Sequence, residues 1–216
     1  MVKKLIATAW LLLPLVAAAQ NVWEVPNAKA AEEVRKTEKE VKPEKENPDA
    51  PYLRGAVPEV DGKVVWTYQI EAPGKSAQEL FDRTCDYFNR LAEEEGQLEG
   101  SGISLVNRQE HIVVASIREW MTFRTSLLSL DRTKIYYRVV VDCKDGSADI
   151  TIDRISFRYE EERNPGAKPL KAEEWISDKA AVSKKNKLYK GSAKFRRKTV
   201  DRMNELRESL SRELTK

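Results

Sequence analysis

Residues 134–159 constrain the fold most, because they predict two β-strands joined by a tight turn. Apolar and polar residues alternate over the first half of this stretch, which is typical of a strand with one buried face. The residues that share the apolar face are Ile135, Tyr137, Val139, Val141 and Cys143. An Asp-Gly pair lies within the turn at residues 144–147. The fold is therefore expected to contain an antiparallel sheet.

The returning strand, residues 148–159, changes phase part of the way along. Ile150 and Ile152 share one parity, whereas Ile155 and Phe157 take the other. A β-bulge near Arg154 would add one residue and bring both pairs to the same face. We therefore predict a bulge at this position.

Two amphipathic helices are predicted to cover the sheet. Ser76 and Glu79 fit a capping box at the start of the first helix, which ends near Gly96. Its apolar stripe consists of Leu80, Phe81, Thr84, Cys85, Phe88, Leu91 and Ala92. The second helix spans residues 193–214. Its stripe consists of Phe195, Thr199, Met203, Leu206, Leu210 and Leu214.

Three further runs, residues 63–70, 103–107 and 111–118, predict strands, and residues 119–131 are expected to form a loop. The order is strand, helix, four strands, helix. We therefore predict an α+β fold, a curved antiparallel sheet with helices packed on one face.

The N-terminal part predicts export. Residues 1–19 have a positive head, a short apolar run and three alanines, the layout of a secretory signal peptide. Residues 20–56 are rich in lysine and glutamate and are expected to form a largely disordered tether. A single domain, residues 57–216, follows and includes a Lys-rich segment at 160–192. The mature protein is expected in the periplasm or cell envelope, or secreted.

The charge and the cysteine and histidine content exclude several functions. Loss of Lys3 and Lys4 with the signal peptide lowers the formal charge from +3 to +1, so specific nucleic-acid binding is not expected. Two cysteines and the single histidine, His111, are too few for a usual zinc site. We expect neither a metal nor a cofactor.

Three motif fragments are interpreted as structural. Gly74, Lys75 and Ser76 lack the earlier glycine of a phosphate loop, so they predict a capped helix start. The acidic residues near position 145 lack the calcium-loop spacing and predict a hairpin turn. His111 is the only imidazole base and has no nucleophile elbow near it. No catalytic residue is assigned.

Cys85 and Cys143 both fall on predicted inward faces, one on the first helix and one on the sheet. Because an exported chain meets an oxidising compartment, a disulfide from helix to sheet is one alternative. The other alternative is a pair of buried free thiols.

A basic segment is the clearest candidate binding site. It comprises Lys184, Lys185, Lys187, Lys190, Lys194, Arg196, Arg197 and Lys198, with Lys179 just before it. Clustered lysines contact anionic lipid or other polyanions. The alternative is a solvated loop that leads into the last helix.

The uncovered sheet face is the second candidate. Trp120, Phe123, Tyr136 and Arg138 are expected on this face or in the loop at 119–131. Aromatic side chains on an open sheet stack on a ligand or meet a second protomer. A homodimer through the sheet is therefore one expected arrangement.

Three stretches also resemble a known family. Residues 57–65 read VPEVDGKVV, residues 76–81 read SAQELF, and residues 136–157 form the hairpin with its Lys-Asp-Gly turn. They are similar to exported bacterial envelope proteins known as domain of unknown function 4468, over roughly residues 57–158. The resemblance implies export and a TATA-box-binding-protein-like fold, a curved sheet backed by helices. It implies no catalytic residues.

The expected function is therefore an exported, non-catalytic binding module. Its partner would be an envelope protein, a peptide or an anionic surface component. A polyanion or membrane-surface binder acting through residues 179–198 is the first alternative. A carboxylate-based hydrolase, for which the sequence nominates no residues, is the second.

Overall fold

The computed structural model describes residues 47–126, 129–161, 163, 165–166 and 168–216. The principal elements are β3 (Trp66–Glu71), α2 (Ala77–Ala92), β4 (Gly102–Asn107), β5 (Ile112–Ser126), β6 (Ser129–Lys144), β7 (Ser147–Tyr159) and α5 (Lys190–Leu214). The short elements are η1 (Ala50–Tyr52), β1 (Glu59–Val60), β2 (Lys63–Val64), β8 (Leu170–Lys171), α3 (Ala172–Trp175) and α4 (Asp178–Ala181). The predicted signal peptide and the tether up to residue 46 lie outside the described residues.

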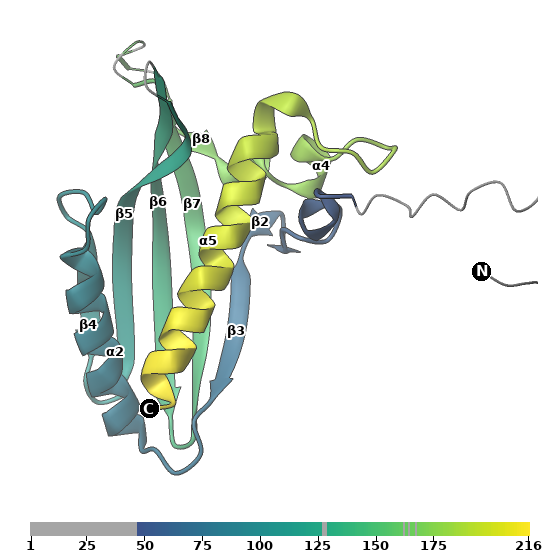
Figure 1. Cartoon of the computed structure of the whole chain (residues 1–216). Coiled ribbons are helices and arrows are strands. Elements are labelled where there is room, and N and C mark those ends of the chain that lie inside the picture. Colours follow the sequence, from purple (N-terminus) through teal and green to yellow (C-terminus); the bar gives the residue numbers. More distant parts are fainter. Residues whose placement is uncertain (1–46, 127–128, 162, 164, 167) are drawn as a thin grey trace, which may run out of the picture. The chain divides into compact units, whose positions relative to one another are not determined.

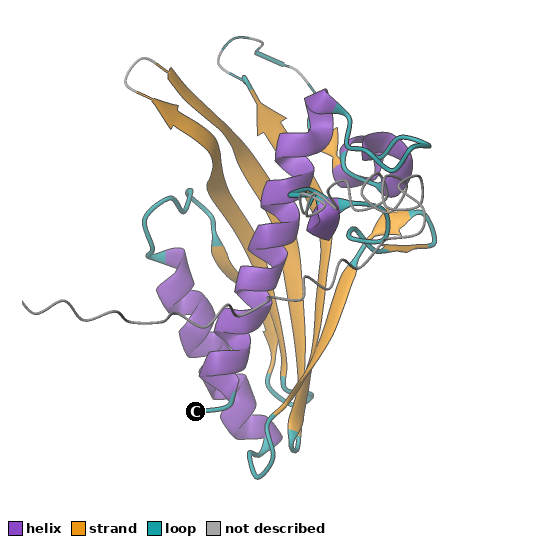
Figure 2. Ribbon diagram, turned by 45° about the vertical axis from the view of Figure 1, so that its right-hand side comes forward, coloured by secondary structure: helices purple, strands orange, loops and turns teal. Residues whose placement is uncertain are grey.

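The predicted α+β architecture is confirmed. The strands form an antiparallel sheet in the order β3-β7-β6-β5-β4, and β8 pairs with β7 beyond the end of β3. Helices α2 and α5 lie on the same face of this sheet (Figures 1 and 2). None of the helices in the described part of the chain lies on the opposite face of β5, β6 and β7. None of the described helices is long and apolar enough to cross a membrane.

The core lies between the sheet and the two helices. The buried residues of α2 are Leu80, Phe81, Thr84, Phe88 and Leu91. All six residues of the predicted α5 stripe are buried as well. Each large apolar side chain buried in this way contributes about 1.5–3 kcal/mol. The helical periodicity was therefore a sound guide to the buried faces.

The predicted β-bulge is confirmed. The register between β6 and β7 shifts between Tyr136 and Arg138. Arg154 has a positive φ of 55° and is exposed, which places Ile152 and Ile155 on the same buried face. The extra residue thus explains the phase change in the sequence.

The predicted loop at residues 119–131 is wrong. Strands β5 and β6 continue through it and remain paired as far as Ser126 and Ser129, with a second bulge between Thr122 and Arg124. Met121 is buried under the helices, but polar residues separate it from the earlier apolar run. Pairing with β6, rather than local alternation, holds this part of β5 in the sheet.

The domain begins about ten residues earlier than expected. Residues 47–56, placed in the tether by the sequence, pack on the domain, and Tyr52 lies against the core. The carbonyl oxygens of Tyr52 and Leu53 accept hydrogen bonds of 2.6 Å from Arg196. A partner more than 140 residues away leaves no local trace in the sequence.

The segment at residues 160–192 also differs from a solvated loop. It contributes β8, α3 and α4, and both Ile176 and Ala181 are buried. Helix α5 starts at Lys190 rather than at residue 193. This part of the chain is an integral layer of the domain.

Candidate functional site

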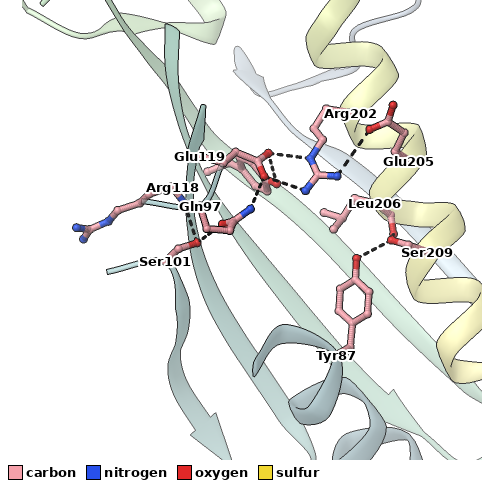
Figure 3. A network of polar contacts seen from close by, with 10 residues as sticks. Tyr87, Gln97, Ser101, Arg118, Glu119, Arg202, Glu205, Leu206 and Ser209 are labelled. Carbon is pink, nitrogen blue, oxygen red and sulfur yellow. Dashed lines mark hydrogen bonds and ion pairs between the residues drawn. The ribbon is translucent and has the colours of Figure 1, made fainter. Parts of the chain in front are cut away.

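A buried carboxylate joins β5 to α5. Glu119 is 6% exposed and receives two hydrogen bonds from Arg202, from Nε to Oε1 at 2.7 Å and from Nη2 to Oε2 at 2.8 Å. The Tyr137 hydroxyl donates to Oε1 at 2.9 Å and the Gln97 amide to Oε2 at 2.7 Å. Ser101 then donates to Gln97 (Figure 3).

This network is saturated. Four donors occupy the roughly four acceptor positions that a carboxylate offers. Burial and the nearby Glu119 charge raise the pKa of Tyr137 well above its usual value, so the hydroxyl stays a donor. The arrangement ties α5 to the sheet and leaves Glu119 no free position for a substrate or an attacking water.

A shallow cleft of about 270 Å³ lies beside the network. Its charged lining residues are Glu94, Glu95, Glu119, Lys198, Asp201, Arg202 and Glu205. The sequence did not identify this cleft, because Glu119 stood at the start of a predicted loop. Glu119 and Arg202 are engaged with each other, and the other carboxylates that line the cleft are those of Glu94, Glu95, Asp201 and Glu205.

The structure separates the predicted basic site into side chains with different roles. Arg196 is fully buried and binds Asp178 and the Ile176 carbonyl oxygen, both at 2.6 Å. With its contacts to residues 52 and 53, this guanidinium fastens the N-terminal segment and α4 to α5. Arg196 is therefore a structural residue, and its assignment to a binding site is wrong.

Two further cations of the segment are paired within the domain. Lys194 Nζ lies 2.8 Å from Asp131 Oδ2 and 4.2 Å from the centre of the Tyr159 ring. Arg197 Nε lies 2.7 Å from Asp49 Oδ1. Burial alone would lower the pKa of Lys194, but the hydrogen bonds to Asp131 and Tyr159 outweigh it and raise this pKa.

The remaining predicted binding residues are exposed. Lys184, Lys185 and Lys187 lie on the turn after α4, Lys190 starts α5, and Lys198 borders the cleft. Tyr189, which is 48% exposed, lies among the first four. Of the predicted basic site, therefore, only the lysines of one loop, residues 184–190, are both exposed and adjacent in the chain.

Both cysteines are free thiols, so the helix-to-sheet disulfide allowed by the sequence is not formed here. Cys143 is buried, and its Sγ lies 3.7 Å from the hydroxyl oxygen of Thr84. Burial raises the pKa of Cys143 to about 11. Burial also raises the pKa of Cys85, which is only partly covered.

The motif fragments have structural roles, but only the serine half of the predicted capping box forms. The Ser76 hydroxyl accepts from the Glu79 amide at 3.2 Å, which caps α2. The Asp145 carboxylate accepts a hydrogen bond of 2.8 Å from the backbone amide of Ala77, the first residue of that helix. The Glu79 carboxylate pairs with Lys75 and Arg83 instead of closing the capping box.

The helix-free face consists of five cross-strand rows on β5, β6 and β7. In order along the strands, the rows are Ile112–Asp142–Asp149, Val114–Val140–Thr151, Ser116–Arg138–Asp153, Arg118–Tyr136–Ser156 and Trp120–Lys134–Arg158. The residues between them on β5 and β6 are buried under the helices, so the pleat directs these rows to the other side. We call this set the helix-free face. It contains three of the four residues that the sequence suggested, whereas Phe123 packs on the helix side, 4.6 Å from Phe195.

Charge is segregated along this face. Lys134 and Arg158 lie in the row nearest the β5–β6 tip, where Glu161 contacts both, at 2.9 and 2.6 Å. Asp142 and Asp149 form the carboxylates of the opposite row. The Arg138–Asp153 ion pair lies in the row between them. The face is therefore positive at one end and negative at the other.

Aromatic side chains lie within the positive half. The guanidinium of Arg132, just beyond the last row, sits 3.7 Å from the centre of the Trp120 ring. The Lys134 ammonium is 5.5 Å from the same ring. Tyr136 is half-buried in the adjacent row. Aromatic rings and cations thus lie side by side on paired strands.

Comparisons with known proteins identify relatives of the fold and no function. Residues 66–158 match the family model described as "Domain of unknown function (DUF4468) with TBP-like fold". A DUF4468 family protein from Bacteroides ovatus is 37% identical with a TM-score of 0.71, covering 79% of this chain and 96% of its own. A TBP-like protein from Parabacteroides distasonis is 17% identical with a TM-score of 0.56, covering 74% and 97%, and supports the fold alone. No curated protein matches the chain.

Proposed function

The chain belongs to the DUF4468 family with its TBP-like fold, and we propose that it is an exported, non-catalytic binding module of the cell envelope. In this proposal the helix-free face contacts the surface of a partner protein. The family carries no known activity, so the argument rests on the surfaces of this chain.

The segregated charges and aromatic rings of the helix-free face carry the proposal. Trp120, Tyr136 and Lys134 are presented by paired strands, which fixes their positions before any partner arrives. Such preorganisation reduces the entropy lost on binding. By contrast, the charged side chains of Glu119 and Arg196 on the helix side are engaged in hydrogen bonds within the domain.

Quantitative capture from extracts of the producing cells tests this proposal. The full chain is compared with Trp120→Ala and Lys134→Ala, and with the matched controls Tyr189→Ala and Lys187→Ala on the loop after α4. Point variants are required because α5 supplies part of the core. We expect the face variants to lose a captured protein that the controls retain. Equal capture by all five chains would contradict a role for the face.

A second candidate is binding to an anionic membrane surface through the remaining basic loop. The observation that favours it is the exposed Tyr189 among Lys184, Lys185, Lys187 and Lys190. Each lysine near an anionic surface contributes about 1 kcal/mol. Replacing these four lysines with glutamine should abolish sedimentation with vesicles rich in anionic lipid. Unchanged sedimentation would remove this candidate.

Export is part of the proposal and has its own test. Cleavage after Ala19 would give a mature chain that begins at Gln20. Mass spectrometry of the protein recovered from the envelope fraction should identify that N-terminus. Recovery of the chain with Met1 or Val2 at its start would contradict cleavage.

A further inference from the structure

The charge pattern of the helix-free face is complementary to itself after a rotation of 180° that reverses the direction of the strands. Lys134 and Asp142 each lie four residues from Arg138 along β6, in opposite directions. On β7, Arg158 opposes Lys134 and Asp149 opposes Asp142. On β7, Asp149 lies four residues and Arg158 five residues from Asp153, and the extra residue belongs to the bulge at Arg154. A rotation of 180° about an axis through the Arg138 row, perpendicular to the strands, therefore exchanges the positive and negative rows.

We infer that the partner of this face is a second copy of the chain, stacked face to face across that twofold axis. This inference rests on the proposed function and names its partner. Lys134 then lies over Asp142 of the second copy, and Arg158 lies over its Asp149. Arg138 and Asp153 lie on the axis, so each faces its own copy, and the ion pair within each chain offsets their charges.

The same rotation matches two pairs of apolar groups, and it places Val114 over Arg118 of the second copy. Trp120 and Ile112 occupy equivalent places in the two outer rows of β5, so the indole of one chain covers the isoleucine of the other. Tyr136 and Val140 are related in the same way on β6. Aromatic rings packed on aliphatic side chains supply the buried apolar area that drives association. Charge complementarity then fixes the orientation.

The opposite orientation is disfavoured. Stacking the strands in parallel, about an axis along β6, would place Lys134 over its own copy and Asp142 over its own copy, with Arg158 over Trp120 and Asp149 over Ile112. Like charges brought together at an interface cost several kcal/mol. The pattern thus selects one of the two face-to-face arrangements with twofold symmetry.

The charged side chains of the two outer rows are exposed enough to form ion pairs with a second copy. Lys134, Arg158, Asp142 and Asp149 have side-chain exposures between 30% and 41%. Their present neighbours, Glu161 and Lys144, lie at the two ends of the face and can stay in contact in the dimer. The next positions outward, Arg132 and Lys144, are both cations, which limits the contact to the five rows.

The area of the face sets the expected strength. Five rows span about 27 Å along the strands, and the three strands β5, β6 and β7 span about 10 Å across, so the rows of each copy bury roughly 270 Å². Stable complexes bury about 800 Å² on each partner, and weak ones less than about 600 Å². We therefore expect a weak, reversible dimer that forms only at high micromolar concentration.

Sedimentation velocity on the purified full chain, at about 1–200 µM, tests the inference. The wild-type chain should pass from monomer to dimer over this range. Lys134→Glu and Asp142→Lys should each raise the dimer dissociation constant by about tenfold, because each opposes like charges twice across the twofold axis. The two substitutions in one chain should recover most of the loss. Lys187→Glu on the loop after α4 should leave the dimer unchanged.

Each outcome decides the inference. A wild-type chain that stays monomeric throughout would overturn it, as would single reversals without effect or a combined variant that fails to recover. Thermal unfolding of every variant separates loss of dimer from loss of fold. If the chain is monomeric but Trp120→Ala and Lys134→Ala still lose a captured protein, the proposed function stands and only the second copy is excluded.

Discussion

Two arginines of α5 hold this helix to distant parts of the chain through buried contacts. Arg202 meets the Glu119 carboxylate on β5, and Arg196 meets Asp178 together with three backbone carbonyl oxygens. Both are planar guanidinium groups, which suits them to several hydrogen bonds in fixed directions. Their charge serves folding rather than recognition.

Replacing Arg196 with methionine should destabilise the domain by about 3–5 kcal/mol, because Asp178 and the carbonyls would lose their buried partner. Urea denaturation of Arg196→Met measures this loss. Lys198→Ala, two positions further along α5 and exposed, should stay within about 0.5 kcal/mol of the wild type. Equal stability of the two variants would contradict the structural role of Arg196.

The thiols should differ in reactivity. Since the thiolate is the reactive form, a pKa of about 11 and burial both protect Cys143. At about pH 8, a thiol reagent should label Cys85 in the native protein and Cys143 only after unfolding. The variant Cys85→Ser should therefore show no labelling while folded. Rapid labelling of Cys143, or an absence of free thiols before unfolding, would contradict the structure.

At the scale of elements, the bulge in β7 was predictable because both sides of the phase change are strongly apolar. Ile150 and Ile152 precede Arg154, and Ile155 and Phe157 follow it, so only an extra residue keeps all four inside. The outer half of β5 was not predictable in this way. Its residues 122–126 are mostly polar, and pairing with β6 decides their conformation.

Substitutions at Arg154 should report on its left-handed backbone. A φ of 55° costs a residue with a side chain about 1–2 kcal/mol, and a β-branched residue more. Arg154→Val should therefore lower the free energy of unfolding by roughly 1 kcal/mol or more. Arg154→Gly should be close to neutral, because glycine adopts this conformation freely but loses more backbone entropy on folding than arginine does. Equal losses in thermal unfolding would show that the bulge is not strained.

The contact between β6 and α5 should make stability sensitive to acid. Burial raises the pKa of Asp131, but the hydrogen bonds from Lys194 and Tyr159 outweigh it and lower this pKa below its usual value. A lowered carboxyl pKa stabilises the fold above the unfolded pKa, and this contribution disappears as pH falls through the folded pKa. Asp131→Asn should therefore be less stable at neutral pH and lose less stability on acidification. An unchanged pH profile would contradict the ion pair.

At the scale of the molecule, the sequence predicted the layers but not the surfaces. Period-two and period-3.6 patterns identify which face of each element is buried, and this information is local. The roles of Arg196 and Glu119 depend on partners from 18 to 144 residues away in the chain, so a basic run was interpreted as a binding site. Likewise, the two charged ends of the helix-free face become visible only when β5, β6 and β7 are placed in register.

Residue-level footprinting tests the central claim, that the helix-free face is the contact surface, most directly. Lysine acetylation and carboxyl labelling are measured on the dilute purified chain and on the chain in extracts of its own cells. We predict that Lys134 and Asp142 lose reactivity in the extract, whereas Lys184 and Lys185 keep theirs. Unchanged reactivity of Lys134 and Asp142, together with protection of Lys184 and Lys185, would contradict the account and move function to the basic loop.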